Sequence, residues 1–153
     1  MPSEIERKYL VDLAAWHPRD AGTPYRQGYL SSQAERVVRV RIEGDAARLT
    51  IKGKTVGVTR AEFEYPIPLA DAPALLALCE QPLIDKIRHK ETHGGKVWEI
   101  DVFHGANEGL VIAEIELASE DEAFERPAWV GAEVSSDPRY YNANLIARPF
   151  KTW

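Results

Sequence analysis

The sequence predicts a mainly β protein of the α+β class, built on a closed eight-stranded antiparallel β-barrel with short flanking helices. About eight segments alternate apolar and charged residues with a period of two, the mark of strands with two different faces. Short turns such as residues 43–46 and 93–95 join several of them, and consecutive hairpins make an antiparallel sheet. A sheet of this size can close on itself and so lose its edges.

Length and composition describe an ordinary globular protein. The chain has 153 residues, of which 44% are hydrophobic and 28% charged, and we expect one domain over 1–153. A net charge of -5 argues against nucleic-acid binding. Cys79 is the only cysteine, which excludes a disulfide framework. The absence of a long apolar run and of an apolar signal core predicts a cytoplasmic protein that does not span a membrane.

The first half of the chain should contain five strands and two helices. The strands are predicted at residues 3–10, 25–30, 36–42, 48–52 and 60–65. Asp12 is placed to cap a short helix over 12–16, and Asp71 to cap a helix over about 72–80. Pro66 and Pro68 end the fifth strand, because proline cannot donate to a strand ladder.

The second half repeats the scheme with three strands and two helices. The strands are predicted at residues 84–90, 97–103 and 110–117. Ser119 and Glu122 form a capping-box pattern, which predicts a helix to about residue 126. Asp137 followed by Pro138 predicts a last helix that runs through Leu145.

The charged faces of these strands are sorted by sign. Acidic strands carry Glu4 and Glu6, Glu62 and Glu64, Glu99 and Asp101, and Glu114 and Glu116, whereas basic strands carry Arg39 and Arg41, Lys52, and Lys86, Arg88 and Lys90. Like charges opposed across strands cost free energy, so this sorting favours a ligand that offsets them.

Periodicity does not decide which face is inside. A sandwich would leave the charges in water, whereas a barrel could turn them into its lumen. Such a lumen suits a polyanionic phosphate chain held by Arg and Lys, with divalent metal ions between the phosphates and the glutamates. No G-x-x-x-x-G-K-[ST] or G-x-G-x-x-G motif is present, so side chains would hold the phosphates.

The run Glu4-Ile5-Glu6-Arg7-Lys8 resembles the E-x-E-x-K signature of the CYTH superfamily, the triphosphate tunnel metalloenzymes, and the later doublets follow that family's order over essentially the whole chain. The resemblance implies an eight-stranded tunnel with phosphate and metal sites inside. Family members hydrolyse inorganic or thiamine triphosphate, or cyclise ATP. This chain looks like the compact bacterial branch, in which inorganic triphosphatase activity is the commoner attribution.

The resemblance also implies a role for each charged position. The phosphate-binding residues would be Arg39, Arg41, Lys52, Lys86 and Arg88. The ligands of one or two Mg²⁺ or Mn²⁺ ions would be Glu4, Glu6, Glu62, Glu64, Asp101, Glu114 and Glu116. Tyr29 matches a tyrosine that the family pairs with the motif lysine, Lys8. Its phenol could ionise near Lys8 and accept a proton, or it could only hydrogen-bond phosphate.

Three functions remain open at this level. The first is metal-dependent hydrolysis of inorganic triphosphate to diphosphate and phosphate, with a small-molecule triphosphate as the partner. The second is a thiamine or nucleoside triphosphatase or a class IV adenylyl cyclase, although the sequence shows no adenine-specific signal. The third is a non-catalytic polyphosphate-binding module, against which the intact acidic strands argue. Related proteins can be dimers, so a homodimer is also an expectation.

Overall fold

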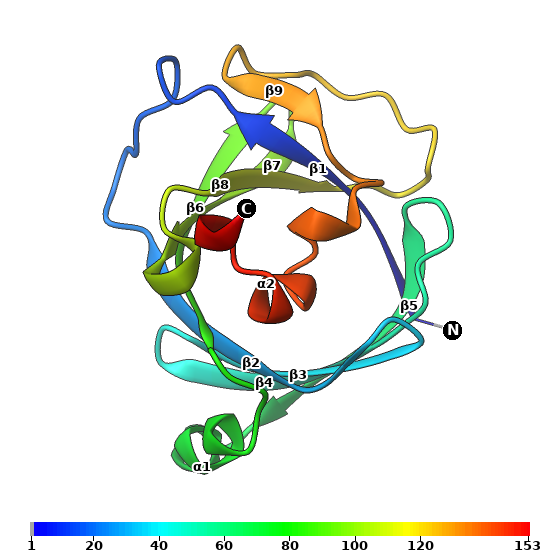
Figure 1. Ribbon diagram of the computed structural model, residues 1–153. Helices are drawn as coiled ribbons and strands as arrows, with labels where there is room; N and C mark the ends of the chain where they lie inside the picture. The colour runs from blue at the N-terminus through cyan, green and yellow to red at the C-terminus, as the bar shows by residue number, and fades with distance from the viewer. Residues whose placement is uncertain (1) are drawn as a thin grey trace.

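The fold is a ring of eight antiparallel strands, which Figure 1 shows along the axis of the ring. The computed structural model describes residues 2–153. The sheet order is β5-β4-β3-β2-β6-β7-β8-β1, and pairing of β5 with β1 closes it. The closing ladder is short and runs from Ser3 opposite Ala61 to Ile5 opposite Thr59. The predicted mainly β fold with a closed eight-stranded sheet is therefore confirmed.

The eight predicted strands are all present. They are β1 (Ser3–Val11), β2 (Thr23–Gln33), β3 (Arg36–Glu43), β4 (Ala46–Gly53), β5 (Thr59–Ile67), β6 (Ile84–His93), β7 (Lys96–His104) and β8 (Val111–Glu116). Most are a few residues longer than the alternation predicts, because ladder pairing continues into the turns.

One strand was not predicted. β9 (Val130–Glu133) pairs with the outer end of β1, where Tyr9 lies opposite Glu133 and Val11 opposite Val130. β1 thus offers one edge to β8 and divides its other edge between β5 and β9.

The helices are shorter than predicted. They are η1 (Leu69–Asp71), α1 (Ala72–Ala77), η2 (Gly105–Asn107), η3 (Pro138–Tyr140), α2 (Asn144–Ala147) and η4 (Phe150–Thr152). The last predicted helix is split into η3 and α2, which lie within the outline of the ring in Figure 1, whereas α1 lies outside it. Within residues 2–153, no helix has both the length and the apolar character that crossing a membrane requires.

Two predicted helices are wrong. Residues 12–16 form a turn, in which Asp12 accepts a hydrogen bond from the Ala14 amide at 3.0 Å but no further helical turn follows. Residues 119–126 form no helix. Glu122 does accept from a backbone amide, that of Ala118 at 2.6 Å, but its carboxylate also pairs with Lys96 of β7. This ion pair ties the segment to the outside of the ring.

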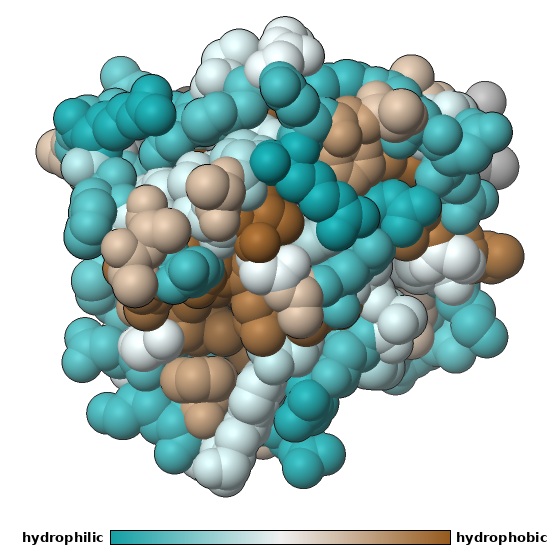
Figure 2. Space-filling view, turned by 90° about the horizontal axis from the view of Figure 1, so that it is seen from above, coloured by the Kyte–Doolittle hydropathy of each residue, from teal (hydrophilic) through white to brown (hydrophobic). Residues whose placement is uncertain are grey.

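Apolar residues pack on both faces of the ring. Two clusters lie on the outer face, one around Trp98 and one between α1 and β3. Seen from the β9 side, the outer surface shows some apolar side chains between hydrophilic ones (Figure 2). A third cluster includes Tyr29, Val37 and Ile84, which share the alternating faces of the charged residues, and it packs against Leu145 of α2. This apolar layer fills one end of the ring, and the charged residues surround the remaining space.

Candidate active site

The charged faces enclose a cavity of about 470 Å³ inside the ring. Thirteen of the fourteen predicted site residues line it: Glu4, Glu6, Lys8, Tyr29, Arg39, Arg41, Lys52, Glu62, Glu64, Lys86, Arg88, Glu114 and Glu116. The fourteenth, Asp101, is not a lining residue. Of the two architectures left open by periodicity, the ring with internal charges is the one observed.

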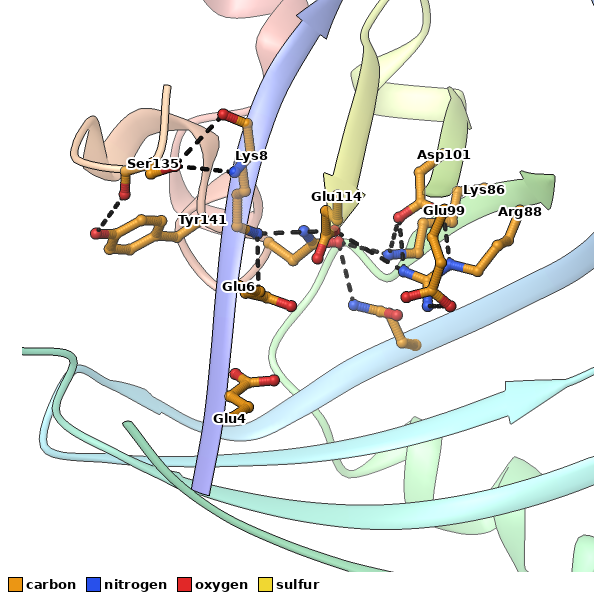
Figure 3. A network of polar contacts seen from close by, with 12 residues as sticks. Glu4, Glu6, Lys8, Lys86, Arg88, Glu99, Asp101, Glu114, Ser135 and Tyr141 are labelled. Carbon is orange, nitrogen blue, oxygen red and sulfur yellow. Dashed lines mark hydrogen bonds and ion pairs between the residues drawn. The ribbon is translucent and has the colours of Figure 1, made fainter. Parts of the chain in front are cut away.

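Asp101 lies behind the cations of β6. Its carboxylate accepts two hydrogen bonds from Arg88, at 2.7 and 2.9 Å. It also forms an ion pair with Lys86 at 2.8 Å. Burial alone would raise the pKa of Asp101, but Arg88 and Lys86 lower it far below its ordinary value. The carboxylate is fully buried, so it orients both cations toward the cavity from beneath. Figure 3 shows the three side chains together.

A second ion-pair group joins β1, β4 and β5. Glu4 lies 2.8 Å from Lys52 and 2.8 Å from Arg60, and Lys52 lies 3.3 Å from Glu62. Burial would raise the pKa of Glu4, but Lys52 and Arg60 lower it to about 2. Burial and the adjacent Glu4 charge raise the pKa of Glu62 to about 7. Lys52 and Arg60 therefore compensate the charge of Glu4, whereas the charge of Glu62 is compensated only in part.

The β1–β8 wall brings carboxylates together. Glu6 lies directly opposite Glu116, and Lys8 opposite Glu114. The Lys8 ammonium is 3.8 Å from both Glu6 and Glu114 (Figure 3). Burial would lower the pKa of Lys8, but these two carboxylates raise it. The pKa of Glu116 is raised by burial and by the negative charges of its neighbours, Glu4 and Glu6 among them.

The arginines of β3 form the opposite wall. Arg39 lies 3.5 Å from Glu64 and Arg41 lies 3.8 Å from it. Thr50 fixes this carboxylate with a hydrogen bond of 3.0 Å. Tyr25 packs against Arg41 and Arg88, with its ring centroid 4.9 and 4.8 Å from the two guanidinium carbons. The aromatic face holds both guanidinium groups in place.

Tyr29 is buried beside these cations. Burial raises its pKa above the ordinary value, although Arg39 and Lys8 act in the opposite direction. Gln27 Nε2 donates a hydrogen bond to its hydroxyl oxygen at 3.0 Å. The easier ionisation expected from Lys8 is not found, because loss of hydration outweighs the nearby positive charge. Its role as a proton acceptor stays a prediction.

Several lining residues were missed by sequence reasoning, among them Tyr25, Glu43 and Asn142. Tyr25 shares the alternating face of Tyr29, which could have revealed it. Glu43 and Asn142 also line the cavity. Glu43 was read only as part of a turn, and Asn142 lies in an irregular segment that carries no periodic signal.

The chemistry of the carboxylates suits a divalent cation. They are hard oxygen donors, and the raised pKa values of Glu62 and Glu116 show negative charge that the protein's own cations do not fully offset. No three carboxylate or imidazole groups within residues 2–153 are close enough to hold a metal ion by themselves. Mg²⁺ commonly takes one or two carboxylates and completes its shell with water and substrate phosphates, so the arrangement fits.

A closed antiparallel ring that encloses sorted cations and carboxylates defines a tunnel protein built for anionic ligands. Among known protein families, the model of the CYTH domain matches residues 2–150 of this chain. The chain belongs to the CYTH domain family.

Two relatives named as enzymes cover all or nearly all of the chain. It is 47% identical over 154 aligned positions to an inorganic triphosphatase of Acetivibrio thermocellus, which covers 100% of this chain and 99% of the relative. It is 36% identical over 147 positions to an inorganic triphosphatase of Nitrosomonas europaea, covering 94% and 96%. The crystal structure of an inorganic triphosphatase matches with 34% identity, a TM-score of 0.66 and 95% of each chain. A Pyrococcus horikoshii structure, at 16% identity and TM-score 0.59 over 77% of this chain and 80% of its own, shares the fold.

Proposed function

We propose that this protein hydrolyses inorganic triphosphate to diphosphate and phosphate, with residues 1–153 as one catalytic domain. The observation that carries the proposal is that ten Lys and Arg side chains and eight glutamates line the same cavity inside the ring. Two full-length relatives named inorganic triphosphatase support it. No feature of the cavity favours the thiamine, nucleotide or purely binding alternatives.

The cations bind and orient the phosphate chain. Arg39 and Arg41 approach it from β3, and Lys86 and Arg88 from β6, so two positively charged walls adjoin the intervening strand β2 and contact the phosphates from one side of the ring. Lys52 is the fifth of these groups, although it also pairs with Glu4. Phosphoryl transfer depends mainly on charge neutralisation and in-line positioning, which these walls supply.

The β1, β5 and β8 carboxylates are proposed to hold the divalent cation, Mg²⁺ or Mn²⁺. The residues in question are Glu4, Glu6, Glu62, Glu64, Glu114 and Glu116. When bound, the metal neutralises phosphate charge and lowers the pKa of coordinated water. Asp101, predicted as a further ligand, is given a positioning role instead, because its oxygens are already bonded to Arg88 and Lys86.

Lys8 and Tyr29 are proposed to act next to the reacting phosphate. Lys8 stays protonated between Glu6 and Glu114 and presents a positive charge to the phosphate oxygens. Tyr29 keeps its hydroxyl proton in the resting protein, since its pKa is raised by burial, and donates it in a hydrogen bond to the substrate. Action in the cytoplasm and the pairing of two copies stay predictions from the sequence.

The test is phosphate release from tripolyphosphate, thiamine triphosphate and ATP, each with Mg²⁺, with Mn²⁺ and with EDTA. We expect hydrolysis of tripolyphosphate in preference to the other two, and its loss in EDTA. Arg39→Ala, which removes one charge-assisted contact, should weaken kcat/KM about ten- to a hundredfold. Equal activity with and without metal would contradict the proposal.

A further inference from the structure

The segment between η3 and α2 reaches into the cavity from the end of the ring that the apolar layer fills. Asn142 and its neighbour Tyr141 both line the cavity. The Tyr141 hydroxyl donates to the Ser135 carbonyl oxygen at 3.2 Å, and Leu145 is fully buried three residues beyond Asn142. The backbone that carries Asn142 is thus anchored on both sides, which limits the entropy lost when its side chain binds a ligand.

The orientation of the Asn142 amide is determined by Lys86. Lys86 Nζ lies 2.9 Å from Asn142 Oδ1, and an ammonium group has only hydrogen-bond donors. The amide atom that faces Lys86 must therefore be the oxygen. Gln27 Nε2 donates to the same oxygen at 3.3 Å, which gives Oδ1 two donors.

The amide nitrogen of Asn142 is left for a ligand. No hydrogen bond within residues 2–153 occupies its Nδ2, and the residue lines the cavity beside Lys86. Gln27 Nε2 also donates a hydrogen bond to the Tyr29 hydroxyl oxygen at 3.0 Å, so this oxygen, like Asn142 Oδ1, acts as an acceptor. Its own proton is then free to point elsewhere. A nitrogen and a hydroxyl, both acting as donors, lie next to the cationic walls.

We propose that Asn142 is a substrate-binding residue whose Nδ2 donates a hydrogen bond to a phosphate oxygen of the triphosphate. Lys86 and Gln27 hold its carbonyl oxygen, so the two N–H groups point toward the anion. The irregular C-terminal segment therefore supplies a phosphate contact that none of the eight ring strands provides. This inference rests on the proposed triphosphatase function and deepens it.

Two backgrounds separate this role from a structural one. Asn142→Leu removes the acceptor for Lys86 and the donor for phosphate together. If Nδ2 binds phosphate itself, Asn142→Leu reduces tripolyphosphate affinity about tenfold both in the parent protein and in a Lys86→Met background. If Asn142 only holds Lys86, the substitution has no further effect once Lys86→Met has removed the ammonium group.

The measurement is calorimetric binding of tripolyphosphate in EDTA, together with kcat and KM in Mg²⁺. Thr152→Val is the matched control, because the exposed Thr152 side chain donates to the Pro149 carbonyl oxygen in the C-terminal segment and does not line the cavity. We expect its affinity to stay within about twofold of the parent. A Thr152→Val loss as large as that of Asn142→Leu, or an Asn142→Leu loss that disappears in the Lys86→Met background, would overturn the assignment. A parent protein that neither binds nor hydrolyses tripolyphosphate would instead refute the proposed function.

Discussion

The β6–β7 wall and the β1–β5 wall of the ring differ in how far their buried charges are compensated by charges of opposite sign. In the first, Asp101 lies between Lys86 and Arg88 with all three contacts at 2.7 to 2.9 Å. In the second, Glu4 takes the close contacts of Lys52 and Arg60, and Glu62 is left with a pKa of about 7. One wall is internally compensated, whereas the other is short of positive charge.

The difference indicates which wall binds phosphate and which wall binds a metal cation. A compensated wall is rigid and presents its cations in fixed directions, which suits the recognition of phosphate oxygens. A wall with surplus carboxylates attracts a cation from solution. Removing a carboxylate charge should therefore destabilise the protein at the β6–β7 wall and stabilise it at the wall with surplus carboxylates.

The largest effect is expected from Asp101→Asn. It removes the buried counter-charge that Lys86 and Arg88 share and leaves Arg88 with Glu99 at 3.0 Å and Glu114 at 3.8 Å. Breaking a buried ion pair costs about 3–5 kcal/mol of unfolding free energy. Urea denaturation measures the loss. Asp85→Asn is the control on the neighbouring strand β6, since Asp85 forms an exposed pair with Arg26 at 3.4 Å and should lose only about 0–1 kcal/mol. Similar losses in both variants would contradict the comparison.

A smaller effect is expected from the protonation of Glu62. Its folded-state pKa of about 7 lies above the ordinary value of 4.5 for a glutamate, so the stability it contributes is present below pH 4.5 and is lost as the pH rises through 7. In EDTA, this decline should amount to about 1–2 kcal/mol and should disappear in Glu62→Gln. Melting temperatures from about pH 5 to 8 measure it. Glu64→Gln, which alters the same strand, should retain the decline; its disappearance there would assign the effect elsewhere.

The smallest effect is expected from Glu116→Gln. The substitution removes a carboxylate directly opposite Glu6, so the metal-free protein should be unchanged or more stable by about 0.2–1 kcal/mol. The rise in melting temperature on addition of Mg²⁺ or Mn²⁺ should shrink at the same time. Thermal melts with EDTA and with each metal test both parts. A destabilised metal-free variant would show that Glu116 is already compensated.

Most of the ring could be predicted because strand alternation is a local property. Each charged doublet, such as Arg39 with Arg41, points to one side whatever the rest of the chain does. Alternation does not say which side is inside, and it does not say how deep a residue lies. Asp101 shows the second limit, since it shares a face with the lining residues yet lies beneath Arg88.

The errors fall where tertiary contacts outweigh local preference. The Ser119–Glu122 pattern is a helix start, but Phe124 packs against Tyr9 and Trp98, with ring centroids 6.3 and 5.8 Å apart. Helix propensity amounts to tenths of a kcal/mol per residue, less than such aromatic burial contributes. β9 is short and lacks alternation, so it forms only because part of the β1 edge is left unpaired by β5.

The apolar layer at one end of the ring affects where an anionic ligand can be held in the cavity. A ligand that moves past the arginines meets the apolar side chains of Val37 and Leu145. These side chains offer a phosphate oxygen neither positive charge nor a hydrogen-bond donor, so an anion is retained among the charged residues instead of moving on toward this end.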